Sequence, residues 1–162
     1  MPKIPLFVAI AAAVIALGYF GFITNATAYA GSAPATCNNC HVMDSQYENW
    51  YHGAHQNWAK CTDCHLPHDN FAAYYLEKSR QGMKDVFAFT TGNIPVAIRA
   101  SDKTKKIIQA NCIRCHEETV EDIMMGTQPF DRYCWDCHRN VAHGSRGISI
   151  VPYQDSILYP SK

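Results

Sequence analysis

The distribution of apolar residues divides the chain into two parts. From Ile4 to Ile23 the chain runs without a single charged residue, and a helix of about 20 residues spans about 30 Å, the thickness of a bilayer core. Lys3 precedes this run, which predicts a cytoplasmic N-terminus and a body on the periplasmic, or extracytoplasmic, side. We therefore expect residues 1–30 to form an uncleaved transmembrane anchor in the cell (inner) membrane and residues 31–162 to form a second domain.

The segment Ala28-Tyr29-Ala30 offers an alternative, because it is similar to the cleavage site of a secretory signal peptide. Cleavage there would release a soluble domain. The apolar run is longer than the ~7–15 residues of a secretory apolar core, which favours the retained anchor. Both interpretations place the body of the protein across the membrane.

Within the body, the clearest helix is predicted between Asp69, a candidate N-cap, and Gly92, a candidate C-terminal stop. Residues at steps of four and three share one face of this helix: Phe71, Tyr75, Lys78, Gly82, Asp85 and Phe89. The pair Lys78 and Asp85 distinguishes this face from an ordinary core stripe. A simpler alternative is that both charges lie in water at the edge of the stripe.

Two further helices are expected, one from Ser101 or Asp102 to about residue 110 and one over about residues 117–125. No segment alternates long enough to predict a strand, and the chain after Val141 is typical of an irregular tail. The expected fold is therefore mainly α with much irregular structure, consisting of one transmembrane helix and one compact domain.

Charge and composition exclude some functions. Lys plus Arg equals Asp plus Glu at 14 each, so the formal net charge is zero, which argues against a nucleic-acid-binding protein. Residues 31–162 leave little sequence for an ordinary apolar core, so another component must fill the interior of this domain. Eight cysteines in 162 residues indicate disulfides, metal sites or an attached cofactor.

The cysteines decide between these options because all eight belong to one repeated pattern, C-x-x-C-H. The four copies are Cys37–His41, Cys61–His65, Cys112–His116 and Cys134–His138. This pattern is the attachment sequence of c-type haem: both thiols bond to the porphyrin and the histidine binds the iron. Zinc sites or disulfides would not require a histidine after every cysteine pair.

The sequence therefore predicts a tetrahaem cytochrome c. The residues that bond covalently to the four haems would be Cys37, Cys40, Cys61, Cys64, Cys112, Cys115, Cys134 and Cys137. Four histidines remain outside the motifs: His52, His55, His68 and His143. Because haems used in electron transfer take a second axial ligand, these histidines are ligand candidates, with His55 and His143 preferred. The alternative role for each is a hydrogen bond to a haem propionate.

Taken together, the stretches CNNCHVM, CTDCHLPH, CIRCH and CWDCHRNVAH behind one apolar anchor resemble the tetrahaem quinol dehydrogenases of anaerobic respiration. The resemblance is to the small membrane subunit of the cytochrome c nitrite reductase complex. It implies a protein that oxidises menaquinol and passes electrons to a pentahaem catalytic subunit, which reduces nitrite to ammonium. The alternative partner is another terminal reductase, for nitrate or for an N- or S-oxide.

The resemblance also implies roles for residues near the first motif. Met43, rather than His41, would bind the first haem iron, and a thioether ligand raises the reduction potential. Asp85 would accept a proton from the quinol, and Lys78 would orient the quinol oxygen or tune Asp85.

For the other haems, the resemblance implies two axial pairs: His116 with His143 on the third haem, and His138 with His55 on the fourth. His65 would bind the second haem, whose second ligand stays open between His52, His68 and a side chain supplied by a partner protein.

Overall fold

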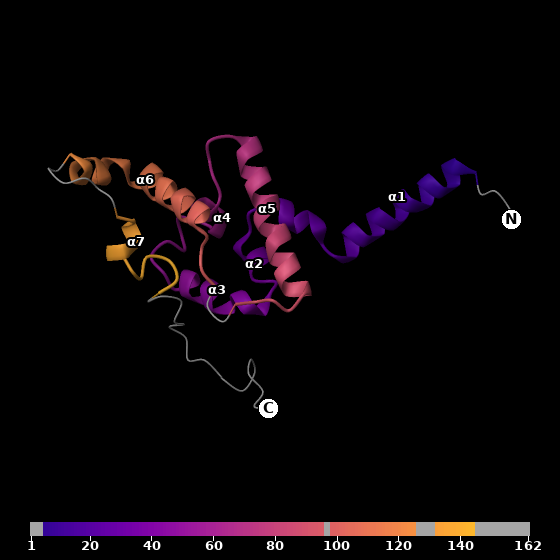
Figure 1. Ribbon diagram of the computed structural model, residues 1–162, viewed down its shortest axis with the longest axis horizontal. Helices are drawn as coiled ribbons and strands as arrows, with labels where there is room; N and C mark the ends of the chain where they lie inside the picture. The colour runs from indigo at the N-terminus through magenta and orange to yellow at the C-terminus, as the bar shows by residue number, and fades with distance from the viewer. Residues whose placement is uncertain (1–4, 96–97, 126–131, 145–162) are drawn as a thin grey trace, which may run out of the picture.

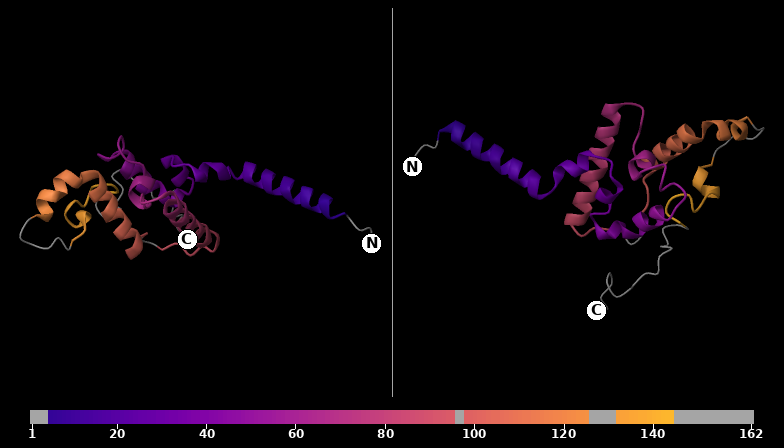
Figure 2. Two further views of the ribbon diagram at one scale, coloured as in Figure 1. Left: turned by 90° about the horizontal axis from the view of Figure 1, so that it is seen from above. Right: turned by 180° about the vertical axis from the view of Figure 1, so that it is seen from behind.

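The computed structural model describes residues 5–95, 98–125 and 132–144. Within these residues the chain consists of helices and irregular segments, without a strand. Helix α1, Leu6–Ile23, extends away from the rest of the molecule in all views (Figures 1 and 2). It buries none of its side chains, its mean hydropathy is 2.5, and it is long and apolar enough to cross a membrane.

The remaining elements are short apart from two. They are η1 (Ala26–Ala30), α2 (Pro34–Cys37), η2 (His41–Met43), α3 (Asp44–Tyr51), α4 (Cys61–His65), α5 (Phe71–Thr90), α6 (Asp102–Met124) and α7 (Cys134–Cys137). Each C-x-x-C-H motif therefore lies on or directly beside a helix. The pattern of apolar residues did not predict α3, an eight-residue helix with a mostly polar sequence.

Helix α5 confirms the predicted long helix and corrects its start. Asn70, not Asp69, is the N-cap: its extended backbone precedes the first helical residue, and its side-chain oxygen accepts from Ala73 N at 2.8 Å. At the other end Gly92 has φ +68°. The amides of Gly92 and Asn93 donate to the carbonyls of Phe89 and Ala88, which is the paired hydrogen-bond pattern that glycine makes accessible at helix ends.

Helix α6 corrects the prediction of two helices separated by the third motif. Ser101 caps its start by accepting from Thr104 N at 3.2 Å, as expected, but the helix continues through the motif to Met124. Residues 102–124 contain neither Gly nor Pro to end the helix. The interruption is a kink at His116, where φ is −114° and ψ is 26°. The boundary expected at Gly126 and the tail after residue 144 lie outside the described residues.

The described residues contain little conventional core. The buried apolar side chains among them are Trp50, Leu66 and Val120, and the buried polar ones are Asn49, Thr62, Glu77, Thr104 and Asn111. Several of these lie where α4 contacts α6 and α5, around the second motif. An interior of this kind fits the expectation that a component other than side chains fills the body.

Candidate functional site

The first motif lies next to the charged face of α5. The pKa of Cys37 is lowered to about 7, mainly by a hydrogen bond with the Cys61 thiol of the second motif. This value also includes a rise caused by burial, a lowering by the charge of Lys78 and a smaller rise by the charge of Asp85. The fold therefore places both predicted quinol residues within electrostatic reach of the first motif.

Lys78 also links α5 to the segment that leaves the membrane helix. Its Nζ donates to the carbonyls of Gly31 and Ala30, the latter at 3.2 Å. The same ammonium lies 5.7 Å from the ring centre of Tyr74 and 5.9 Å from that of Tyr75. Partial desolvation lowers the pKa of Lys78, because burial disfavours a charged ammonium.

Asp85 lies two turns further along α5. The residue as a whole is exposed. Its carboxyl is nevertheless partly desolvated, which raises its pKa, and the positive charge of Lys84 lowers the same pKa by a smaller amount. A carboxylate with a raised pKa is a better proton acceptor than an ordinary surface aspartate.

His41 and Met43 differ in their exposure, although both lie in η2. His41 is exposed, whereas Met43 is half-buried and its amide donates to Cys40 O at 2.8 Å. The methionine is therefore the residue of this pair that is turned toward the body.

The remaining motifs form a continuous series with the first. Cys112 of the third motif hydrogen-bonds to Cys134 of the fourth, and burial, as the main cause, raises the pKa of Cys112 to about 12. Cys64 of the second motif lies within electrostatic reach of Cys115 of the third. The four motifs thus meet in chain order, first to second, second to third and third to fourth.

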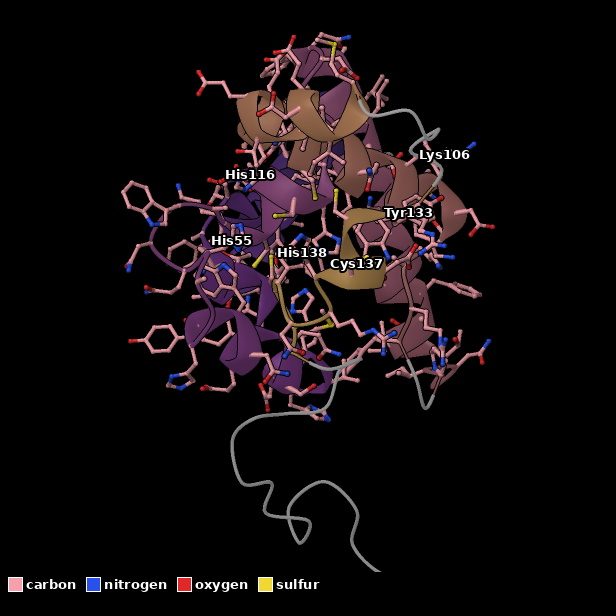
Figure 3. The ribbon with its side chains drawn as sticks, turned by 90° about the vertical axis from the view of Figure 1, so that its left-hand side faces the viewer. His55, Lys106, His116, Tyr133, Cys137 and His138 are labelled. Carbon is pink, nitrogen blue, oxygen red and sulfur yellow. The ribbon has the colours of Figure 1, made fainter. Side chains whose placement is uncertain are left out.

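One predicted axial pair lines a common cavity. A cavity of about 420 Å³ is lined by Ala54, His55, Cys137, His138, Arg139, Asn140 and Val141. Figure 3 shows His55, His138 and Cys137 on this side of the molecule, with His116 above them. His55 Nδ1 lies 3.0 Å from Val141 O, a contact that leaves Nε2 available as a ligand. The cavity is lined by one of the two motif cysteines, by the motif histidine and by the second histidine expected at one haem.

The other predicted pair, His116 with His143, does not meet through a ring contact within the described residues. Instead the rings of His55 and His116 lie 6.1 Å apart, and those of His65 and His143 lie 6.0 Å apart. His143 Nδ1 lies 3.0 Å from Gln46 O. Burial, together with His143, lowers the pKa of His65 to about 4, so its imidazole is neutral and able to bind a metal.

The two further candidates for the second haem both lie on the surface. His52 is exposed and its Nε2 is 3.6 Å from the Glu48 carboxylate. His68 is also exposed and its ring contacts the ring of Tyr74.

The arrangement of sulfur and nitrogen atoms fits attached haem better than zinc or disulfides. None of the eight cysteines is paired in a disulfide. Among the described residues, which include every cysteine and histidine, no three Cys, His, Asp or Glu side chains gather as ligands for one metal ion. The repeated C-x-x-C-H order, with a histidine after every cysteine pair, instead fits attachment of one haem to each motif.

Comparisons with known proteins bear on this arrangement directly. Residues 2–147 match the NapC/NirT cytochrome c family, N-terminal region. The chain belongs to this family. It is therefore a membrane-anchored c-type cytochrome with covalently bound haem, and helix α1 is long and apolar enough to cross a membrane.

Individual relatives agree with this assignment. The chain is 35% identical over 152 residues to the cytochrome c-type protein NrfH of Wolinella succinogenes, covering 85% of this chain and 86% of the relative. It is 36% identical over 107 residues to the cytochrome c nitrite reductase subunit NrfH of Nitratidesulfovibrio vulgaris, covering 66% and 65%.

A solved structure is also similar, with a TM-score of 0.62, 31% identity, and coverage of 88% of this chain and 97% of the other. It is the crystal structure of the cytochrome c nitrite reductase NrfHA complex bound to the HQNO inhibitor. These matches confirm the resemblance to the small membrane subunit of nitrite reductase and the mainly α fold.

Sequence reasoning missed Tyr75 as a contributor to the site. Its hydroxyl donates to Ala30 O at 3.3 Å, beside the lysine that binds the same carbonyl. Its position on the same helix face as Lys78 was the available signal.

Proposed function

We propose that this chain is a membrane-anchored tetrahaem cytochrome c that oxidises menaquinol and passes the electrons to a pentahaem nitrite reductase subunit on the periplasmic side. The observation that carries the proposal is that Lys78 and Asp85, on one face of α5, both lie within electrostatic reach of Cys37. A proton acceptor and the first electron acceptor then lie together, close to the point where the chain leaves the membrane.

The chemistry of quinol oxidation requires this combination. A quinol that becomes a quinone releases two electrons and two protons, so both kinds of acceptor must be near its hydroxyl groups. Haem supplies a one-electron acceptor when it is bound to the motif. Asp85, in its ionised form, accepts one of the two protons, and its raised pKa suits it to do so. Because Asp85 is exposed, it can release that proton to water before it accepts the second.

Lys78 has a positioning role in this proposal. Its ammonium is already held by the carbonyls of Ala30 and Gly31, so its remaining donor capacity has a fixed direction. A quinol oxygen is an acceptor that this ammonium would bind.

The axial ligands are proposed from the same resemblance. Met43 would bind the first iron; His65 the second; His116 and His143 the third; and His138 and His55 the fourth. The shared cavity of His55 and His138 supports the last pair. The half-buried position of Met43 supports its choice over His41.

Partner identity rests on the relatives. Two NrfH proteins and a NrfHA complex are similar to this chain over most of its length. A second candidate, transfer to a reductase for nitrate or for an N- or S-oxide, uses the same quinol chemistry and differs only in the protein that docks.

The test is quinol oxidation by Asp85→Asn. We expect menaquinol oxidation to fall by about a hundredfold or more, the lower range for loss of a general base, with unchanged haem content. Asp122→Asn, which changes an exposed aspartate on α6, is the matched control and should keep full activity. Wild-type turnover by Asp85→Asn would exclude Asp85 as the proton acceptor.

The partner is tested with purified proteins. Quinol-dependent electron transfer through this chain should reduce a pentahaem nitrite reductase and support nitrite consumption. Transfer only to a nitrate or N- or S-oxide reductase would favour the second candidate.

A further inference from the structure

The second motif ends in three backbone carbonyls that accept hydrogen bonds from side chains of other helices. Asn111 Nδ2, on α6, donates to Cys64 O at 3.0 Å and to Leu66 O at 2.8 Å. Gln81 Nε2, on α5, donates to His65 O at 3.3 Å. Carbonyls at a helix end lack partners within the helix, so these side chains fix backbone that would otherwise be free to move.

Gln81 is itself held by a charge network that is centred on the buried Glu77 carboxylate. The same amide nitrogen donates to Glu77 Oε1 at 3.0 Å. Glu77 is 4% exposed and also accepts from Arg80 Nη2 at 2.5 Å and from Lys103 Nζ at 2.5 Å. Because Lys103 belongs to α6, the network joins α5 to α6 and holds the Gln81 amide against α4.

Asn111 is equally constrained. It is 7% exposed, and one of its acceptors belongs to Leu66, which is 4% exposed and is among the few buried apolar residues of the described chain. The best-packed part of the described protein therefore surrounds His65 and its two neighbours, and none of the side chains that hold it has a part in the proposed quinol chemistry.

We propose that Glu77, Gln81 and Asn111 form a carbonyl clamp that positions His65 as the axial ligand of the second haem. The inference rests on the proposed function, since it requires haem on this motif. Groups outside the ligand shell commonly set the orientation of a metal-bound histidine. Here the Asn111 and Gln81 side chains act on His65 through the backbone carbonyls of residues 64, 65 and 66. The second haem is also the one for which this chain offers no assigned second ligand, so the orientation of His65 has a large effect on its iron.

The experiment uses the full-length, haem-loaded protein with Gln81→Leu and Asn111→Leu. Each variant keeps a side chain of similar size and loses the amide donor. A redox titration followed by absorption, with electron paramagnetic resonance of the oxidised protein, resolves the individual haems. We expect the midpoint potential and spin-state signal of one haem to shift while the signals of the others stay in place.

Two further variants separate positioning from general packing. Glu77→Gln removes the charge that holds Gln81 and should shift the same haem signal. Asp102→Asn likewise converts a carboxylate that pairs with a lysine of α6, Lys105 at 2.8 Å, but it lies outside the clamp and should shift none.

The outcomes distinguish the clamp from the proposed function. Wild-type protein whose second-motif peptide carries no haem, by mass spectrometry, would overturn both. Full haem content with unchanged potentials and spin states in Gln81→Leu would overturn the clamp alone. If Asn111→Leu fails to fold, Gln81→Leu decides by itself, because Gln81 is only partly buried and its hydrogen bonds go to His65 O and Glu77 rather than to Leu66.

Discussion

Single residues set the proton chemistry of the proposed quinol site. The difference between Asp85 and Glu77 illustrates this, because both are carboxylates of α5 with opposite pKa shifts. Hydrogen bonds from Arg80, Lys103 and Gln81 outweigh burial and lower the pKa of Glu77 to about 2. Asp85 has no comparable set of donors among the described residues, and desolvation raises its pKa. Of the two, Asp85 is therefore the one suited to exchange protons with a quinol.

The raised pKa of Asp85 predicts the pH dependence of quinol oxidation. The acceptor form is ionised, so the rate should fall as pH drops through the folded-state pKa, which lies above the ordinary value of 3.8. Below this pKa the rate should fall about tenfold per pH unit, as the ionised fraction does. Steady-state rates measured across pH with a soluble quinol check this expectation.

The same shift predicts how stability responds to Asp85→Asn. Desolvation makes the ionised carboxylate less favourable in the folded state, so its removal should not lower the melting temperature. A marked loss of stability in this variant would mean that Asp85 has a structural role instead.

Residue identity predicted the haem attachment sites, but not every axial ligand. The C-x-x-C-H pattern names its own cysteines and histidine. The choice of Met43 over His41 came from family resemblance, because both residues are soft enough and near enough to bind one iron. Likewise, spacing does not reveal that His55 shares a cavity with His138, since the chain between them passes through four helices.

At the scale of elements, α5 was predictable because its signals agree. An amphipathic period, an Asx residue before the start and a glycine after the end all specify the same helix. The extent of α6 was not predictable in the same way. The third motif was expected to separate two helices, but residues 112–116 contain no helix-breaking residue and continue the preceding helix. The eight-residue α3 was missed because its polar residues give no clear apolar face.

Two glycines, one inside α5 and one just after its C-terminus, should respond oppositely to replacement by alanine. Gly92 has φ +68°, so Gly92→Ala should destabilise the protein by about 1 kcal/mol through backbone strain. Gly82 lies inside the helix, and a Cβ added there would meet no atom within 4 Å, so Gly82→Ala should stabilise it by about 0.5–1 kcal/mol. Thermal unfolding in detergent measures both.

The informative result is whether each glycine replacement raises or lowers the stability of the protein. Stabilisation by Gly92→Ala would contradict the positive-φ helix end described above. Destabilisation by Gly82→Ala would indicate that the open space at this position is occupied in the folded, haem-loaded protein.

For the whole molecule, the scarcity of buried apolar side chains sets the folding requirement. Trp50, Leu66 and Val120 are the only buried apolar residues in the described chain, and burial of a large apolar side chain contributes about 1.5–3 kcal/mol. Three such residues fall far short of the conformational entropy of a domain. The porphyrins must supply the rest of the apolar interior.

This shortfall predicts that the chain without haem has no cooperative tertiary fold. Expression without a haem-attachment system should yield a product with helical far-ultraviolet circular dichroism and no sharp thermal transition. Protease should also rapidly digest the domain that follows residue 30 in this product. Protease resistance equal to that of the haem-loaded protein would show that side chains alone suffice.

The hydrogen bonds from Lys78 to Ala30 and Gly31 have a consequence for maturation of the protein. Proteolysis after Ala30 would turn Gly31 into a new amino terminus beside the lysine ammonium, and two positive charges would then repel each other there. The cut would also remove the Ala30 carbonyl that Lys78 and Tyr75 share. Removal of residues 1–30 would therefore be expected to displace the Lys78 ammonium from the position described above.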